Sequence, residues 1–219
     1  MSSTAQRPAV RAQSVREEAA NALSHGLGFL LAALSLQAAG TLTRPGQDRI
    51  DTGVVVFSLS MMLVYGASML YHALPHGCRA RPWFNRLDHA AIFVAIAGSF
   101  TPFGLASVGD DAGRAGFVLV WALAGAGVVA KAGGRLRCPL RSTALYMALG
   151  WTALLAALPA LHGVAAEGLW LVVAGGVAYS VGAGFFLSDH RVPYGHFVWH
   201  VFVLVGSGCH FVAAVQHLA

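Results

Sequence analysis

Charged side chains are scarce in this sequence, since lysine, arginine, aspartate and glutamate together make up only 11% of its 219 residues. A soluble domain usually carries roughly 25% charged residues. Too few polar side chains are therefore present to cover a soluble globule of this size. The shortage excludes an ordinary cytosolic enzyme, a disordered protein and a nucleic-acid-binding module.

Cysteine is also scarce, with three residues spread widely along the chain: Cys78, Cys138 and Cys209. An odd number at such spacing is neither a disulfide framework nor a zinc ribbon of the CxxC type. We interpret these side chains as small buried hydrophobic groups or incidental loop thiols.

Hydrophobic residues are abundant instead, at 57% of the chain, with a mean hydropathy of +0.64. They fall into continuous runs long enough to span a membrane, for which a helix needs roughly 20 residues. We predict an all-α membrane protein, a bundle of seven transmembrane helices, with residues 1–20 as an N-terminal tail and residues 21–219 as a single transmembrane domain. The helices are expected near residues 22–40, 52–73, 88–107, 114–131, 142–161, 166–187 and 196–215.

Basic residues gather on one predicted face of the membrane, which explains the net charge of +5. Eleven of the 14 lie on the side of the N-terminus: Arg7, Arg11, Arg16, Arg79, Arg81, Arg86, Lys131, Arg135, Arg137, Arg141 and Arg191. The opposite side has Arg44, Arg49 and Arg114. The positive-inside rule then predicts a multi-pass protein of the cell membrane with a cytoplasmic N-terminus and an external C-terminus. The basic residues thus indicate anionic lipid headgroups as partners, not nucleic acid.

Small residues recur inside the predicted spans, as in Ala124–Gly127, Gly175–Gly176, Gly182–Gly184 and Gly206–Gly208. Helices in lipid associate through close backbone packing, for which small residues leave room. The pattern predicts a tight bundle. Loops are expected at prolines and glycines such as Pro82 and Pro139.

Ionisable and polar residues inside the spans are concentrated near the ends of four helices. Glu18, Asn21 and His25 open the first helix as one stripe, Ser68 and His72 close the second, Asp88 and His89 open the third, and His196 and His200 open the seventh. In a chain that crosses seven times, these four helix ends lie at the same face. Helix count alone therefore brings the groups to one level, which we predict to be near the cytoplasmic face.

Metal binding suits this set of side chains. His196 and His200 lie one turn apart on one helical face, about 6 Å apart in rise, and zinc suits imidazole nitrogen. With His72, three histidines and one open position are typical of a catalytic zinc site, in which water takes the fourth position. Asp88 can hold or deprotonate that water. Ser68 can orient a ligand or donate to a developing oxyanion.

Other histidines have simpler interpretations. Asn21 and His25 are expected to pack and hydrogen-bond near the site, and His210 lies too far along its helix to share one ion with His200. His89 is expected to be structural. His76, near Cys78 in a loop with proline and glycine, is interpreted as solvated.

The motifs around these residues resemble the bacterial haemolysin III proteins, a branch of the progestin and adipoQ receptor (PAQR) family in a superfamily that also includes alkaline ceramidases. The similar segments cover nearly the whole chain: Glu17–Gly26, Ser68–His72, Leu87–Phe93, Gly98–Phe103, Pro193–Leu204 and Gly206–Phe211. The resemblance implies a seven-helix fold and a buried zinc ion held by His72, His196 and His200, with Asp88 on the zinc-bound water and Ser68 behind the ligands. One departure is Gly195, where many relatives carry a bulkier residue.

Three functions remain open at this point. The first is an intramembrane zinc hydrolase of lipid amide or ester bonds, similar to a ceramidase and acting in membrane-lipid homeostasis. The second is a cytolytic or pore-forming protein, and the third is a lipid receptor or sensor with structural zinc. Membrane lipids are the expected partners, and the sequence identifies neither the substrate nor a protein partner.

Overall fold

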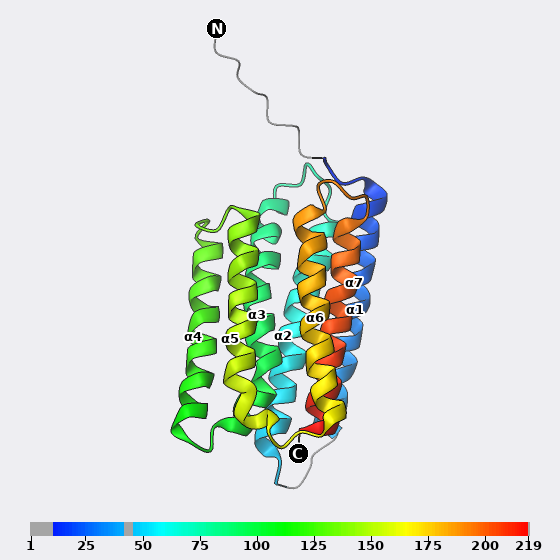
Figure 1. Cartoon of the computed structure of the whole chain (residues 1–219). Helices are drawn as coiled ribbons and strands as arrows, with labels where there is room; N and C mark the ends of the chain where they lie inside the picture. Colours follow the sequence, from blue (N-terminus) through cyan, green and yellow to red (C-terminus); the bar gives the residue numbers. More distant parts are fainter. Residues whose placement is uncertain (1–10, 42–45, 219) are drawn as a thin grey trace.

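The computed structural model describes residues 11–41 and 46–218, and over these residues the chain forms seven long helices that lie side by side (Figure 1). They are α1 (Val15–Thr41), α2 (Asp48–Ala73), α3 (Arg81–Ser107), α4 (Asp111–Ala132), α5 (Pro139–Leu161), α6 (Ala166–Ser188) and α7 (Gly195–Val212). A short π-helical segment, η1 (Ala213–His217), continues α7. The predicted all-α seven-helix bundle is confirmed.

Most helices begin earlier than their apolar runs predict, because polar residues form and cap the first turns. The clearest case is α1, which starts about two turns before the predicted residue 22. There Ser14 and Glu17 form a capping box, in which each backbone N–H is bonded to the other side chain. Pro82 and Pro139, expected in loops, stand in the first turns of α3 and α5. Proline fits there because the first turn of a helix needs no N–H donor.

α3 is the central helix of the bundle. It packs against α2, α4, α5 and α7, and 72% of its most apolar stretch is buried inside the protein, more than in any other described helix. α1 packs on α2 and α7, and α7 also packs on α6. The end of α2 and the start of α7 therefore come within reach of the first turns of α1 and α3 (Figure 1).

Glycines allow close packing between the helices. In each of four glycine clusters one member faces a bulky neighbour: Gly127 faces Phe93, Gly175 faces His210, Gly182 faces Trp199 and Phe202, and Gly206 faces Tyr179. A Cβ at any of these four positions would lie within 3.0 Å of its neighbour. These glycines leave room for side chains of neighbouring helices, whereas the sequence predicted that small residues would bring the helix backbones close together.

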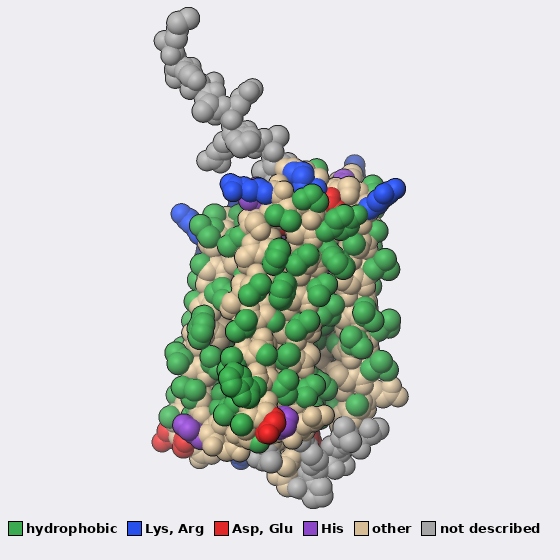
Figure 2. Space-filling view, turned by 45° about the vertical axis from the view of Figure 1, so that its right-hand side comes forward, with side chains coloured by type: hydrophobic (Ala, Val, Ile, Leu, Met, Phe, Trp, Pro, Cys, Tyr) green, Lys and Arg blue, Asp and Glu red, His purple; other side chains and the backbone are tan. Residues whose placement is uncertain are grey.

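The outer surface is that of a membrane protein. All seven helices are long and apolar enough to span a bilayer, and Figure 2 shows hydrophobic side chains covering the sides while charged groups gather at the two ends. Together with the all-helical fold, this makes the chain a multi-pass membrane protein. The side of the membrane on which each end lies stays a prediction. Arg7 and Arg44, which contribute to that prediction, lie outside the described residues.

Candidate metal centre

Three histidines from two helices meet near one end of the bundle. His72 stands in the last turn of α2, His196 in the first turn of α7, and His200 one turn further along α7. One ring nitrogen from each lies within 4.8 Å of those of the other two, and His72 and His200 are 4% and 1% exposed. The structure thus brings together the three residues that the sequence predicts as metal ligands.

The partner of His72 fixes which of its nitrogens is free. The Nδ1 atom lies 2.7 Å from the Glu18 carboxylate of α1, and a carboxylate only accepts, so Nδ1 carries the proton and donates. The Nε2 atom is buried and has no hydrogen-bond partner. The Nε2 atom therefore keeps its lone pair and meets no donor among the described residues, which is the electronic state of a metal-ligating imidazole.

His196 and His200 are held in the same way. The Nδ1 of His196 lies 2.8 Å from the Asp189 carboxylate, and the Nδ1 of His200 lies 3.2 Å from the Asn21 carbonyl and 3.1 Å from the Ser24 hydroxyl. Since a carboxylate and a carbonyl accept, both rings donate from Nδ1. All three histidines are therefore oriented as neutral imidazoles with Nε2 available.

This donor set fits zinc. Three neutral imidazoles, each with its second nitrogen bonded to an oxygen, form the donor set and outer support found at open zinc sites. The orphaned Nε2 of His72 supplies the independent test, because buried polar atoms in proteins are nearly always paired. The residues present thus fit the group that the sequence implies.

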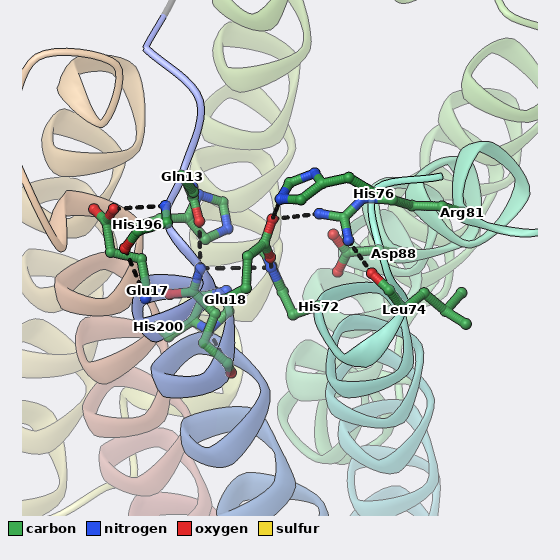
Figure 3. A network of polar contacts seen from close by, with 12 residues as sticks. Gln13, Glu17, Glu18, His72, Leu74, His76, Arg81, Asp88, His196 and His200 are labelled. Atoms are coloured by element: carbon green, nitrogen blue, oxygen red, sulfur yellow. Dashed lines mark hydrogen bonds and ion pairs between the residues drawn. The ribbon is translucent and has the colours of Figure 1, made fainter. Parts of the chain in front are cut away.

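Glu18 is the hub of the polar network around the centre (Figure 3). It accepts from His72 and from Arg81 of α3, and its carboxylate lies 3.5 Å from His76. Arg81 also donates to the Leu74 carbonyl at the end of α2. The carboxylate thereby ties α1 to the end of α2 and the start of α3.

A second ion pair fixes the turn that leads into α7. Arg11 donates two hydrogen bonds to the Glu17 carboxylate, at 2.8 and 2.7 Å, and further bonds to the Asp189 and Val192 carbonyls. Glu17 also accepts from the Tyr194 N–H at 2.8 Å. Because of this pairing, the pKa of Arg11 is raised above its usual value. The N-terminal segment thus stabilises the turn between α6 and α7, in which Asp189 accepts the hydrogen bond from His196.

The turn itself is tight. Tyr194 has a φ of 56°, the left-handed region that residues other than glycine seldom adopt. At Gly195 an added Cβ would lie 3.1 Å from the Cα of Asp189. Gly195 therefore lets the chain pass close to the residue that orients His196.

Asp88 and Ser68, the other two predicted site residues, are both buried. Asp88, in the second turn of α3, is 7% exposed and borders the same cavity as His196 and His200. Ser68 is fully buried on α2, one turn before His72, and its hydroxyl has no hydrogen-bond partner. Ser68 therefore donates no hydrogen bond to any of the three histidines.

An apolar cavity of about 480 Å³ leads from the centre into the bundle. Asp88, His196 and His200 border one end, and Leu161 and His210 border the other. From His200 to His210 the cavity runs along about 15 Å of α7. The wall is mostly aliphatic and aromatic, and toward α5 and α6 it includes Trp151 and Val177, which are 57% and 56% exposed on the outer surface. The cavity thus reaches the membrane-facing side of the bundle.

The remaining histidines lie outside the group of three. His210 is bonded at 3.1 Å to the Val172 carbonyl of α6, in agreement with the interpretation of a buried, hydrogen-bonded side chain. His89 is bonded to the Asn85 carbonyl, and the His76 side chain is 57% exposed. His25 is buried beside His200 but has no hydrogen bond at either nitrogen, contrary to the expected hydrogen bonding.

Sequence reasoning missed Asp189, and it did not assign the roles of Glu17 and Arg11. The role of Glu18 could have been predicted, because Glu18 lies in the same polar stripe of the first helix as Asn21 and His25. Asp189 lies in a loop without periodicity, and its contact with His196 depends on the turn at Tyr194. No spacing rule predicts such a contact.

Comparisons with known proteins identify the family of the chain. A family model described as "Haemolysin-III related" matches residues 13–211. The Hemolysin-3 of Bacillus cereus is 37% identical over 210 residues, 94% of each chain. The Hemolysin-3 homolog of Bacillus subtilis (strain 168) is 35% identical, over 90% of this chain and 92% of its own. The heptahelical transmembrane protein ADIPOR2 of Oryza sativa subsp. japonica is 33% identical, over 73% of this chain and 79% of its own.

Proposed function

The chain belongs to the haemolysin-III related family, and on that premise we propose that it is a zinc-dependent hydrolase of amide or ester bonds in membrane lipids, acting in membrane-lipid homeostasis. One observation carries the proposal. Three imidazoles, each oriented through Nδ1, lie together, and two of them, His196 and His200, border an apolar cavity. A lipid chain in that cavity would place its polar end at the histidines.

The cavity suits a membrane lipid as substrate. Its wall is apolar and borders the membrane-facing surface between α5 and α6, so a lipid can enter from the side without crossing water. Substrates that partition into the bilayer are concentrated there by the hydrophobic effect. The groups proposed to bind or cleave the lipid, Asp88, His196 and His200, border one end of the cavity.

The residues of the centre have distinct tasks in this reaction. When bound, zinc activates water as a nucleophile and polarises a carbonyl group. Asp88 accepts the proton that water gives up and returns it to the leaving amine or alcohol. The free hydroxyl of Ser68 donates to the acyl oxygen as negative charge develops there. Glu18 and Asp189 keep His72 and His196 in the required tautomer.

The test uses purified protein with and without a zinc chelator, offered ceramides, other N-acyl lipids and phospholipids. We expect turnover that depends on zinc, is lost with zinc in His72→Ala, and is lost without loss of zinc in Asp88→Asn. Asp111→Asn, at an exposed site on the opposite end, is the matched control. A broad lipid panel without zinc-dependent turnover would contradict the proposal.

Two other functions are outcomes of the same experiments. The name of the B. cereus relative describes a haemolysin, and a cytolytic role predicts dye leakage from vesicles that persists in His72→Ala. A receptor or sensor with structural zinc predicts that His200→Ala loses zinc and fold together while no lipid is ever turned over. The apolar lining of the cavity favours a lipid site over a water-filled pore.

A further inference from the structure

His210, on α7 at the far end of the cavity, has the opposite tautomer to the three histidines of the metal centre. Its Nε2 atom lies 3.1 Å from the Val172 carbonyl of α6, and because a carbonyl only accepts, Nε2 carries the proton. Inside a membrane the uncharged ring is favoured, and in an uncharged ring with a proton on Nε2 the Nδ1 atom is an acceptor. His210 therefore has a lone pair that neither the metal centre nor the contact between α6 and α7 uses.

The orientation of the ring turns this lone pair away from α6. A Cβ added at Gly175 of α6 would meet the Cδ2 and Nε2 atoms of His210, so this edge of the ring lies against the helix. Nδ1 is the ring atom opposite that edge. It has no hydrogen-bond partner among the described residues but, unlike both nitrogens of His25, it keeps accessible surface. Since His210 borders the apolar cavity, a molecule in the cavity can reach Nδ1.

The cavity wall near His210 is apolar. Leu161 and Phe103, near the ends of α5 and α3, border the cavity at this end. Hydroxyl groups elsewhere in the wall, such as those of Ser99 and Ser180, donate to carbonyls of their own helices. An acceptor left without a donor in apolar surroundings is costly. A donor carried by the occupant of the cavity would remove that cost.

We propose that this end of the cavity is a subsite for a hydroxyl group on the acyl chain of the lipid, which donates to Nδ1 of His210. The inference rests on the proposed function, because it takes the occupant to be an acyl lipid with its polar end at the metal centre. His210 lies about 15 Å beyond His200 along α7. An extended chain of single bonds advances about 1.2 Å per bond, as in a peptide backbone, so the hydroxyl belongs roughly 12 bonds from the acyl carbon. The substrate class is then lipids with a hydroxylated acyl chain.

The test compares fatty acids that differ only in the hydroxyl group. For the zinc-loaded wild type in detergent we measure the Kd of 12-hydroxystearate, 2-hydroxystearate and stearate by displacement of tritiated stearate. We expect 12-hydroxystearate to bind about tenfold more tightly than the other two acids, the effect of one well-placed hydrogen bond. This comparison needs no variant, so it tests the subsite even if a substitution at His210 prevents folding.

His210→Phe keeps a ring and removes the acceptor. We expect the preference for 12-hydroxystearate over stearate to disappear, while stearate binds as in the wild type. The ratio of the two Kd values is the readout, because both are measured on the same protein and a lower Tm from the lost bond to Val172 does not enter it. The matched control is Ser180→Ala, which removes a hydroxyl that lines the same cavity but is bonded within α6. Here the preference should be unchanged.

Each contrary result is distinct. Equal Kd values of 12-hydroxystearate and stearate in the wild type overturn the inference. So does a preference that persists in His210→Phe, since the hydroxyl is then bound elsewhere, or one that is lost equally in Ser180→Ala. If the wild type hydrolyses lipids without distinguishing the hydroxylated chain, the inference fails and the proposed function stands. If it binds none of the three acids and hydrolyses no lipid, both fail together.

Discussion

Hydrogen-bond partners of single side chains decide what the three histidines can do. Glu18, Asp189 and the Asn21 carbonyl all accept, so each ring donates from Nδ1 and keeps the Nε2 lone pair free. Such partners orient the ring and raise its basicity toward a metal. The chemistry of the centre therefore depends on residues that touch neither metal nor substrate.

Glu18→Gln tests this dependence. The glutamine keeps the size of the side chain but removes the charge that His72 and Arg81 share. We expect zinc to bind about 10- to 100-fold more weakly, as for the loss of other such partners, measured by competition with a chromogenic chelator.

Glu167→Gln is the matched control for that experiment, because Glu167 is exposed in the first turn of α6, at the other end of the bundle. Equal zinc affinity in Glu18→Gln and the wild type would show that the carboxylate does not support His72.

Among the helices, the position of α7 depends on the N-terminal segment as much as on its own packing. Arg11 and Glu17 join the start of α1 to the turn between α6 and α7 through the carbonyls of Asp189 and Val192 and the N–H of Tyr194. His196 follows two residues later. The orientation of His196, a proposed metal ligand, thus depends on a segment at the far end of the sequence.

Arg11→Ala should loosen this turn. We expect faster amide hydrogen exchange over residues 189–196 and faster loss of zinc to a chelator, because Asp189 is then less firmly held against His196. Arg11→Lys should restore only part of the effect, since lysine cannot make the two parallel bonds to Glu17. Arg16→Ala, an exposed arginine nearby, is the control. Identical amide hydrogen exchange over residues 189–196 in Arg11→Ala and Arg16→Ala would show that Arg11 does not stabilise this turn.

Helices were the part of the structure that sequence patterns predicted best. Continuous apolar runs located all seven, and the helix count placed His72 level with His196 and His200 before any contact was known. Helix starts were less predictable, because the capping box at Ser14 and Glu17 lies outside the apolar run. The contacts of Arg11 and Asp189 were not predictable, since they depend on a nonrepeating turn with a left-handed Tyr194.

For the whole molecule, the bundle has one strongly basic end (Figure 2), and the candidate metal centre lies close to Arg81 at that end (Figure 3). Described arginines at this end include those around the α4–α5 loop, whereas Arg49 and Arg114 lie at the other end. The positive-inside rule predicts that the basic end is cytoplasmic. A lipid hydrolase with this orientation acts on the cytoplasmic leaflet.

Orientation can be tested with thiols. In a Cys78→Ser background, Cys138, which is exposed just before α5, should be protected from a membrane-impermeant maleimide in intact cells and labelled after lysis. A thiol introduced by Asp111→Cys, where the side chain is 98% exposed at the other end, should be labelled in intact cells. The reverse pattern would overturn the predicted topology.

Zinc K-edge X-ray absorption of the purified protein tests the central claim most directly. An open centre held by His72, His196 and His200 predicts one zinc per chain, coordinated by three imidazole nitrogens and one oxygen, and a coordination number that changes when a ligand histidine is replaced. Absence of stoichiometric zinc, or a closed shell of four protein ligands that leaves no position for water, would contradict it.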